Sequence, residues 1–413
     1  MFATAVKRHL TTCRVVLLTL AMTPALASAA GQAPAAPKPR TGTTSQTAPA
    51  SFESLSKKAD ALRQAGKLPE AVAAYEDALR VRPSWAEGRW YVGTLNYELE
   101  KPAPARAAFL KVIAAQPENA GAWAFAGLCE FQLKKYEPAL GDLMKARELH
   151  VASNKELGAV VRYHAAILLT RFQQFELSQK VLSEFTAEGN DNPKVIEALG
   201  LSTLRIPLLP DELQADRREP VLLAGQGTYY LYVHAMAAAR KSLEELVRRF
   251  PDTPNTHYAL GVMLLNEDPD AAIEAFKREL DVSPGSVHAM LQIAFEYIKR
   301  SDWANAKTWA SQAVQTVPDN FAGRQAYGQA LLELNETDEA IKQLEAGVAL
   351  ASDSPTLHFM LARAYQKAGR TADAQKERDT FARLDSQARA RNQGTQAVGG
   401  VSLPAPSPAP PQR

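Results

Sequence analysis

Small residues recur at fixed intervals inside apolar segments of the chain. Ala71, Ala105 and Ala139 are 34 residues apart, and Gly or Ala also stands twelve residues before each of them. A larger apolar residue follows each of these alanines four positions later, on the same face of a helix. This pattern predicts pairs of antiparallel helices, here called helix A and helix B, that approach closely where both side chains are small.

The same spacing returns in the second half of the chain. Ala272, Ala306, Ala340 and Ala374 are again 34 residues apart. In five places along the chain a proline follows the alanine of helix B by twelve residues. Proline lacks a backbone N–H and disfavours a helical residue before it, so it ends helix B. We expect about nine units, at residues 52–84, 86–119, 120–154, 159–192, 220–252, 254–285, 287–320, 321–354 and 355–387.

The segment WAFAG at residues 123–127, with the Ala, Leu and Ala positions after it, resembles the tetratricopeptide repeat, a helix pair with the same period. The resemblance covers the chain from about Phe52 to Gln387. It implies an all-α fold, a right-handed α-solenoid of about nine tetratricopeptide helix pairs that is interrupted near the middle. It also implies protein binding without indicating a pathway, because a fold does not determine a function.

Prolines interrupt the repeat pattern near the middle of the chain. Pro207, Pro210 and Pro220 break any helix in this region. We interpret residues 193–219 as a half-unit followed by a loop, which divides the array into an N-terminal block, 52–192, and a C-terminal block, 220–388. The segment is either a degenerate, spliced repeat, or a hinge or separate contact surface.

The two ends of the chain differ in composition from the repeats. A basic start, an apolar run at residues 15–22 and small residues up to residue 30 indicate a signal peptide over residues 1–30. The alternative is an uncleaved membrane anchor, although the apolar stretch is shorter than the ~20 residues that span hydrocarbon. Residues 31–51 and 389–413 are rich in Pro and Ala and are expected to be disordered. The signal predicts export to the periplasm or the extracellular space, with peripheral attachment to the outer membrane as a further option.

The net charge and the cysteine content limit the class of partner and the possible disulfides. The formal net charge is +2, and it becomes −1 without Lys7, Arg8 and Arg14, so it gives no case for a nucleic-acid partner. The only cysteines are Cys13 and Cys129. Signal cleavage would leave Cys129 alone, so we expect no internal disulfide in the mature protein.

Sequence motifs for catalysis and metal binding are absent. The sequence has no H-E-x-x-H, G-x-S-x-G, Walker loop or C-x-x-C, and no two of its seven histidines are four or fewer residues apart. We therefore expect no enzyme activity, no cofactor and no metal. The alternative is an enzyme with its site in the 201–234 insertion, which would show a pocket that gathers Asp211, Glu212, Asp216 or His234.

Helix A is expected to line the concave face of the solenoid. Residues three before and one, four and five after its small residue share a face distinct from the one that packs on helix B. Some tetratricopeptide domains bind C-terminal carboxylates there with Lys, Asn and Arg. That clamp is missing, because the corresponding places hold Ser56, Asp60, Trp90, Thr94, Ala124 and Leu128. We predict instead an apolar groove for partner peptides or helices, formed by Trp90, Thr94, Tyr97, Leu128, Phe131, Tyr258, Phe295, Phe359 and Arg363.

Two other interpretations of this face stay open. Some of its residues could pack between neighbouring repeats, and Trp90 and Tyr97 could stack on the sugars of a glycan or cell-wall polymer. Our hypothesis is a non-enzymatic scaffold or assembly factor of the cell envelope that binds partner proteins. It has no nucleic-acid partner and no integral membrane span after signal cleavage.

Overall fold

The structure, a computed structural model, describes residues 51–397 and the side chains of residues 51–390. This part of the chain contains nineteen α-helices and no strand. The predicted signal peptide, nearly all of the linker at 31–51, and residues 398–413 lie outside it. Contacts divide the chain between Val161 and Arg162 into two compact units, here unit 1 and unit 2, and each is described by itself.

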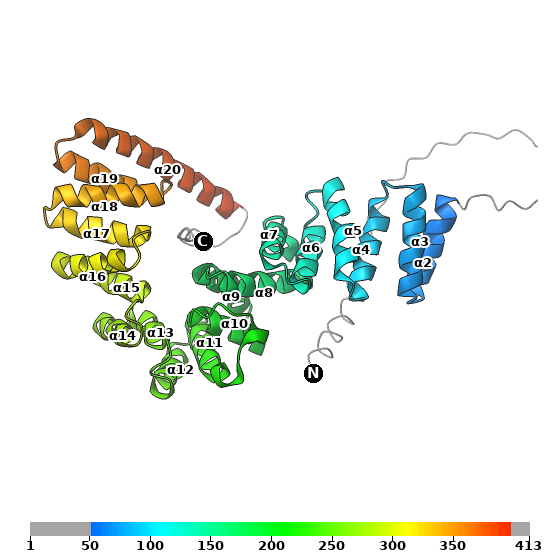
Figure 1. Cartoon of the computed structure of the whole chain (residues 1–413), viewed down its shortest axis with the longest axis horizontal. Helices are drawn as coiled ribbons and strands as arrows, with labels where there is room; N and C mark the ends of the chain where they lie inside the picture. The colour runs from blue at the N-terminus through cyan, green and yellow to red at the C-terminus, as the bar shows by residue number, and fades with distance from the viewer. Residues whose placement is uncertain (1–50, 398–413) are drawn as a thin grey trace, which may run out of the picture. The chain divides into compact units, whose positions relative to one another are not determined.

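Unit 1 is built from consecutive antiparallel helix pairs (Figure 1). Its helices are α2 (Phe52–Gln64), α3 (Leu68–Val81), α4 (Ala86–Glu98), α5 (Pro102–Ala115), α6 (Ala120–Gln132), α7 (Tyr136–Glu148) and the first part of α8 (Lys155–Arg171). A short 3-10 turn, Val151–Ser153, precedes α8.

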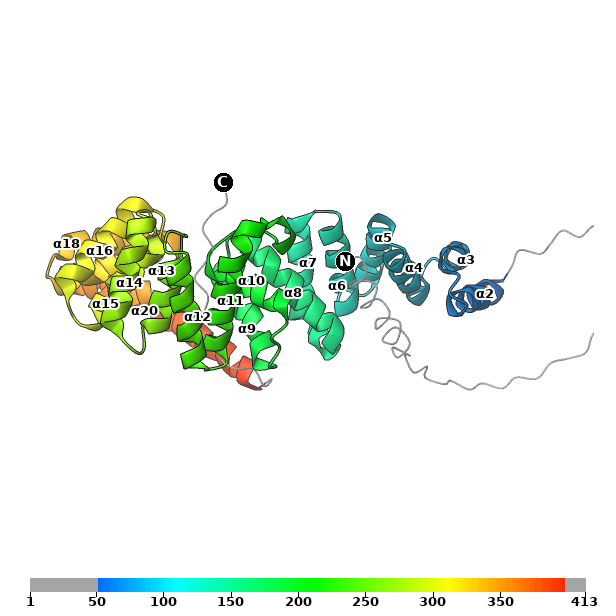
Figure 2. The ribbon, with the colours of Figure 1, turned by 90° about the horizontal axis from the view of Figure 1, so that it is seen from below.

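Unit 2 continues the series from within α8 (Figures 1 and 2). Its further helices are α9 (Phe175–Ala187), α10 (Pro193–Thr203), α11 (Arg218–Tyr232), α12 (Met236–Arg249), α13 (Thr256–Leu264), α14 (Pro269–Val282), α15 (Val287–Lys299), α16 (Trp303–Thr316), α17 (Phe321–Glu333), α18 (Thr337–Leu350), α19 (Pro355–Lys367) and α20 (Thr371–Ala397). Nine helix pairs coincide with the nine predicted units, and α10 is the single additional helix. The predicted all-α fold of repeated helix pairs is confirmed.

The small residues of helix A lie where a larger side chain of helix B presses on the backbone. A Cβ atom added to Gly127 would lie 2.8 Å from Leu143 Cγ and 3.1 Å from the carbonyl oxygen of Ala139. A Cβ atom added to Gly93 would lie 2.7 Å from the nearest atom of the Phe109 ring. All three distances are shorter than an ordinary van der Waals contact, so the spacing of small residues in the sequence indicates this close helix crossing.

The turn from helix A to helix B uses a left-handed backbone residue in most pairs. Gly66 has a φ of 71°, and Glu100 and Lys134 hold the same place with φ values of 57° and 58°. The next amide then donates to a carbonyl of helix A, as Lys101 N does to the oxygen of Asn96 at 2.9 Å. The geometry is therefore repeated even where the residue is not the glycine that favours it.

The interruption at 193–219 is packed into unit 2 through backbone contact between α10 and α11. A Cβ atom on Gly200 would overlap the carbonyl oxygen of Val221, and one on Gly225 would overlap that of Ile196. These two helices therefore touch along their backbones, which only glycine permits at the crossing.

Side chains of the interruption also belong to the core of unit 2. Leu204, Ile206 and Leu213 are buried in one cluster with Val221 and Leu243. Because this segment shares a core with the repeats that follow it, we interpret it as a spliced part of the array rather than as a hinge.

Two boundaries in the structure differ from those expected from the sequence. The contact division falls inside α8, at residues 161 and 162, whereas the predicted division of the repeats lies at 193–219. Helix α20 runs for 27 residues and ends at Ala397, beyond residue 388, where the predicted C-terminal block ends. None of the helices in residues 51–397 combines the length and the apolar character that a membrane span requires.

The α10–α11 crossing can be tested with one added methyl group. We expect Gly225→Ala to lower the free energy of unfolding of unit 2 by about 1–3 kcal/mol, because overpacking outweighs the gain in helix propensity. Gly141→Ala on α7 is the matched control, since this glycine is also helical and its Cβ would enter open space. Urea unfolding of the whole chain, followed by far-UV circular dichroism, measures both. Equal stability of the two variants would show that α10 and α11 do not depend on backbone contact.

Candidate partner-binding surface

In unit 1, two of the predicted groove residues pack against the next repeat. The Trp90 ring lies edge-on to Phe109 and to Phe125, with ring centroids 5.5 Å and 5.7 Å away. The Tyr97 ring also meets Phe125 edge-on, at 5.2 Å. All four side chains belong to one apolar cluster that joins α4, α5 and α6. Trp90 and Tyr97 are half-buried, so part of each side chain packs within the repeats.

Two further predictions in unit 1 are corrected by burial. Thr94 is 5% exposed and Leu128 is 4% exposed, so neither lines an open groove. The Thr94 hydroxyl donates to the carbonyl of Tyr91 in its own helix, at 3.3 Å. Helical spacing placed both residues on the predicted face, but the folded protein buries them. Phe131 is half-buried and its ring packs 5.7 Å from that of Tyr136 at the start of α7.

In unit 2, the predicted residues form a surface that is more accessible. It consists of the predicted residues Tyr258 on α13, Phe295 on α15, and Phe359 and Arg363 on α19. The structure adds Val262, which follows Tyr258 by one turn on α13. We call it the A-helix face of unit 2. Successive A helices are in contact, from α11 to α13 and from α15 through α17 to α19. Figure 1 shows α11, α13 and α15 on the inner side of the arc that unit 2 forms, with α12, α14 and α16 on its outer side.

Apolar side chains on this face are exposed to solvent. Val262 is 37% exposed and Phe359 is 47% exposed. Tyr258 and Phe295 are half-buried. The Phe359 ring packs on Phe381 of α20, with centroids 5.5 Å apart, which fixes its position on α19.

Polar groups surround Tyr258 at one end of the face. Its ring packs 5.5 Å from Phe276 and 6.4 Å from His288 on α15. Arg205, which follows α10, donates to Glu176 at 2.7 Å. Tyr258 thus combines an aromatic surface with a polar environment that can accept or donate to a peptide backbone.

His288 is held neutral by its surroundings. Burial lowers the pKa of its imidazole to about 4, and the positive charge of Arg205 acts in the same direction. The carboxylate of Glu176 opposes both effects. Near neutral pH the imidazole is therefore an uncharged hydrogen-bonding group beside the Tyr258 ring.

The basic residues at the other end of the face are engaged within the protein. Arg363 pairs with Glu333 of α17 at 2.9 Å. Lys367 Nζ donates to the backbone oxygen of Leu332 at 2.9 Å. The face is therefore mainly apolar along its length, with its cations either paired or bound to a carbonyl.

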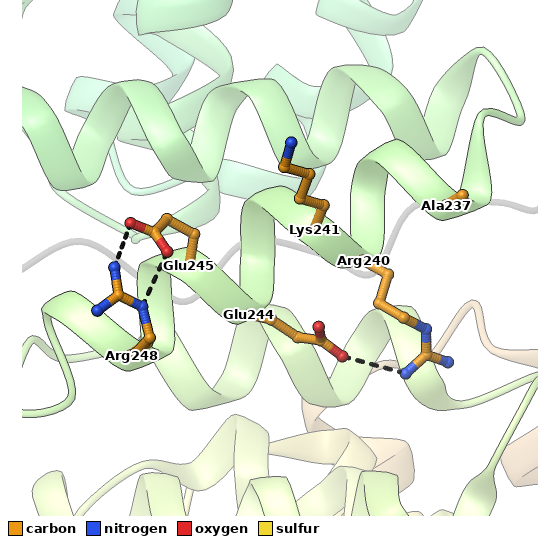
Figure 3. Close-up of a pocket in the computed structure, with 6 residues that line it drawn as sticks. All are labelled: Ala237, Arg240, Lys241, Glu244, Glu245 and Arg248. Carbon is orange, nitrogen blue, oxygen red and sulfur yellow. Dashed lines mark hydrogen bonds and ion pairs between the residues drawn. The ribbon is translucent and has the colours of Figure 1, made fainter.

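Two hollows are described on the surface, and no residue of the A-helix face lines either of them. One, of about 390 Å³, covers the outer side of α12. Figure 3 shows its lining of charged side chains, in which Arg248 bonds to Glu245 and Arg240 to Glu244. Such ion pairs on an exposed helix are typical of a solvated surface.

The second hollow, of about 270 Å³, borders the interruption. It is lined by residues 204–208 with Arg217 and residues 253–255. Asp211, Glu212, Asp216 and His234, the residues named for an enzyme site, are exposed and do not line it. Glu212 instead pairs with Arg171 and accepts a bond from the amide of Leu209. Within residues 51–390, no three His, Cys, Asp or Glu side chains are placed to hold a metal ion.

Comparison with known families accounts for the repeated helix pairs. Models of the tetratricopeptide repeat match residues 56–103, 93–148, 225–287 and 321–364. The chain belongs to the tetratricopeptide repeat family. The matches cover repeats in both units and leave out the interruption at 193–219.

Relatives of this tetratricopeptide repeat protein are distant. It is 24% identical to human protein O-mannosyl-transferase TMTC3 over 269 residues, 61% of this chain and 28% of that protein. It is 24% identical to anaphase-promoting complex subunit 3 of Schizosaccharomyces pombe over 137 residues, 33% of this chain and 20% of that protein. The chain thus spans less than a third of the length of these relatives.

Solved structures of MamA are also similar. One shares 21% identity with a TM-score of 0.36 and covers 40% of this chain and 98% of its own. A double mutant shares 17% identity with a TM-score of 0.39 and covers 42% of this chain and 97% of its own.

Sequence reasoning missed the polar group next to Tyr258. Glu176, Arg205 and His288 come from three different repeats or from the interruption, so no local motif joins them. His288 stands six residues before the small residue Ala294, outside the positions used to define the face. A helical projection extended by one turn would have included it.

The depressed pKa of His288 makes the stability of unit 2 depend on pH. In the unfolded chain the imidazole takes up a proton near pH 6.5, whereas the folded protein resists protonation until about pH 4. The free energy of unfolding that the neutral His288 imidazole contributes is therefore fully present above pH 6.5. It is lost as the pH falls toward 4. We expect His288→Gln to lose less stability than the wild type between pH 7.5 and pH 5, as measured by thermal unfolding. His234→Gln, which changes an exposed histidine, should follow the wild type. A wild-type pH dependence retained in His288→Gln would contradict this account.

Proposed function

We propose that this protein is a non-enzymatic interaction scaffold that binds apolar segments of partner proteins on the A-helix face of unit 2. The observation that carries the proposal is the placement of exposed apolar side chains. Of the four large apolar residues that are exposed among residues 162–390, Val262 and Phe359 lie on this face. The other two, Val317 and Leu350, lie at the ends of B helices.

The chemistry of the face favours a partner with an apolar helix or extended peptide. Tyr258, Phe295 and Phe359 supply aromatic surface, and aromatic anchors contribute strongly to protein interfaces. Arg363 is paired with Glu333, so an acidic partner would have to displace an existing ion pair. Glycan binding has less support, because Trp90 and Tyr97 pack edge-on within unit 1.

Family membership supports the same proposal. Tetratricopeptide arrays present extended surfaces made of successive repeats, and these surfaces are suited to long partner segments. The relative from Schizosaccharomyces pombe is, by its name, a subunit of a multiprotein complex.

We further propose that the scaffold acts in the cell envelope after export. The support is the sequence of residues 1–30, with its basic start, apolar run and small residues before the expected cleavage site. Sequencing the N-terminus of the protein isolated from its host tests this part. A first residue at position 30 or 31 is expected, and a protein that retains residues 1–30 would contradict cleavage.

The partner surface is tested by placing one charge on it. We expect Val262→Glu to reduce capture of partners by residues 31–413 by about tenfold or more, because a carboxylate would have to be buried against apolar surface. Leu350→Glu is the matched control, since Leu350 is 38% exposed, apolar and located at the end of a B helix. Crosslinking in envelope extract followed by quantitative mass spectrometry measures the captured proteins.

The two variants separate the possible outcomes. Both should keep the helical content of the wild type, because both positions are exposed. Partners lost with Val262→Glu and kept with Leu350→Glu support the proposal. Equal capture by Val262→Glu, Leu350→Glu and the wild type would refute a partner surface on the A-helix face.

A further inference from the structure

We infer that His358 and Glu377 form a pH-sensitive latch, which holds α20 on α19 and weakens as the pH rises. Its basis is the set of hydrogen-bond partners of one buried imidazole, compared with the side chains that other repeats carry in the same place. The latch goes beyond the proposed function, because it concerns how the last helix of unit 2 is held.

The first turn of helix A is tied to the turn before it in several repeats. The side chains of Trp123 and Arg324 each donate to the carbonyl oxygen of the residue six positions earlier, at 2.8 Å and 3.1 Å. His257 and His358 occupy the same place, and Nε2 of each lies 3.1 Å and 3.0 Å from the corresponding carbonyl oxygen. Because a carbonyl oxygen only accepts hydrogen bonds, Nε2 carries the proton in both imidazoles.

His358 differs from the others because its second nitrogen faces a carboxylate. Nδ1 lies 2.5 Å from Oε2 of Glu377 on α20. The two side chains are 7% and 14% exposed, so their contact is largely shielded from water. A neutral imidazole with its proton on Nε2 presents a lone pair at Nδ1, and a carboxylate oxygen presents another. This contact is therefore a hydrogen bond only if one further proton lies between the two atoms.

The preceding repeat makes the same contact without a titratable proton. Nη1 of Arg324 donates to Oε1 of Gln343 at 2.5 Å, and these two residues are 19 positions apart, as are His358 and Glu377. Arginine stays charged throughout the physiological range of pH, and a glutamine amide is neutral. Both contacts join helix A to helix B of one repeat, but of the two only the last can titrate near neutral pH.

No second charge neutralises the contact. Within residues 51–390, neither His358 nor Glu377 forms another ion pair. Helices α17, α18 and α20 pack on α19. Charged groups on these helices and in the preceding turn either have partners of their own, as do Arg324, Glu333, Glu345 and Asp373, or are exposed, as are Asp338, Asp353 and Lys376.

The shared proton determines the direction of the pH dependence. Histidine ordinarily changes charge between pH 5 and pH 8. With the proton in place the contact is a charge-assisted hydrogen bond, and without it two lone pairs face each other in a buried contact. Because the docked state binds the proton, the contribution of the latch is present at mildly acidic pH and is lost as the pH rises toward 8. This direction is opposite to that expected for His288.

Release of α20 would change one end of the A-helix face. Phe381 follows Glu377 by one turn on α20, and its ring packs 5.5 Å from that of Phe359. Phe359 is adjacent to His358 in the sequence and belongs to the A-helix face. A loosened α20 would free the Phe359 ring, so partner binding would depend on pH in the same range. This consequence rests on the proposed function, whereas the latch itself does not.

Hydrogen–deuterium exchange of the full chain measures the latch without a partner. We expect the protection of amides in residues 371–385, corrected for intrinsic exchange at each pH, to fall about tenfold or more between pH 6 and pH 8. Amides of α17 should keep their protection, because Arg324 does not titrate in this range.

Two variants imitate the preceding repeat and should remove the pH dependence. Glu377→Gln supplies an amide N–H that can donate to Nδ1 of a neutral His358, and His358→Arg supplies a permanent charge to Glu377. In each variant α20 should be equally protected at pH 6 and pH 8. His257→Gln is the matched control and should behave as the wild type. His257 makes the same carbonyl contact, but within residues 51–390 no carboxylate pairs with it.

Equal protection of α20 at pH 6 and pH 8 in the wild type would overturn the inference. A wild-type pH dependence that persists in Glu377→Gln and His358→Arg would overturn it as well. Partner capture at the two pH values separates the latch from the proposed function. Capture that is sensitive to Val262→Glu, with no pH dependence of α20, would refute the latch and leave the proposed function standing. A pH-dependent α20 with capture insensitive to Val262→Glu would refute the proposed function and support the latch alone.

Discussion

The close approach of helix A and helix B at a glycine or alanine is the constraint on which the rest of the structure depends. One helix pair cannot bury its apolar surface alone, so the repeats must stack, and they stack in register only if each pair keeps the same crossing. Gly127 against Leu143 shows the geometry, with no space for a Cβ atom between the two helices. The fixed crossing then determines which residues of helix A face away from helix B and become available to a partner.

The interruption obeys the same constraint in a stronger form. Gly200 and Gly225 bring the backbones of α10 and α11 into direct contact, where the ordinary pairs place a leucine or phenylalanine against a glycine. An unpaired helix can therefore be inserted without opening the core. Asn255 contributes a further link, since its side-chain amide donates to the carbonyl of Leu204 at 3.0 Å and ties the start of α13 to the end of α10.

Much of this fold could be predicted from the sequence, because periodic small residues and prolines report a repeated local contact. The family, the helix pairs and the position of the additional helix follow from that spacing. The left-handed turns at Glu100 and Lys134 could not be predicted by the usual signal, since neither residue is glycine. The candidate site was predicted less well. Spacing identifies a helical face but not its burial in the folded protein, so Thr94 and Leu128 belong to that face and are nevertheless buried.

The central proposal is that partners occupy the A-helix face of unit 2. Hydroxyl-radical footprinting of the protein with and without its captured partner tests this most directly, because aromatic side chains report their own solvent exposure. The account predicts that oxidation of Tyr258 and Phe359 falls on binding, while that of Trp303, at the start of α16, does not change. Unchanged oxidation of Tyr258 and Phe359, with protection elsewhere in the chain, would contradict it.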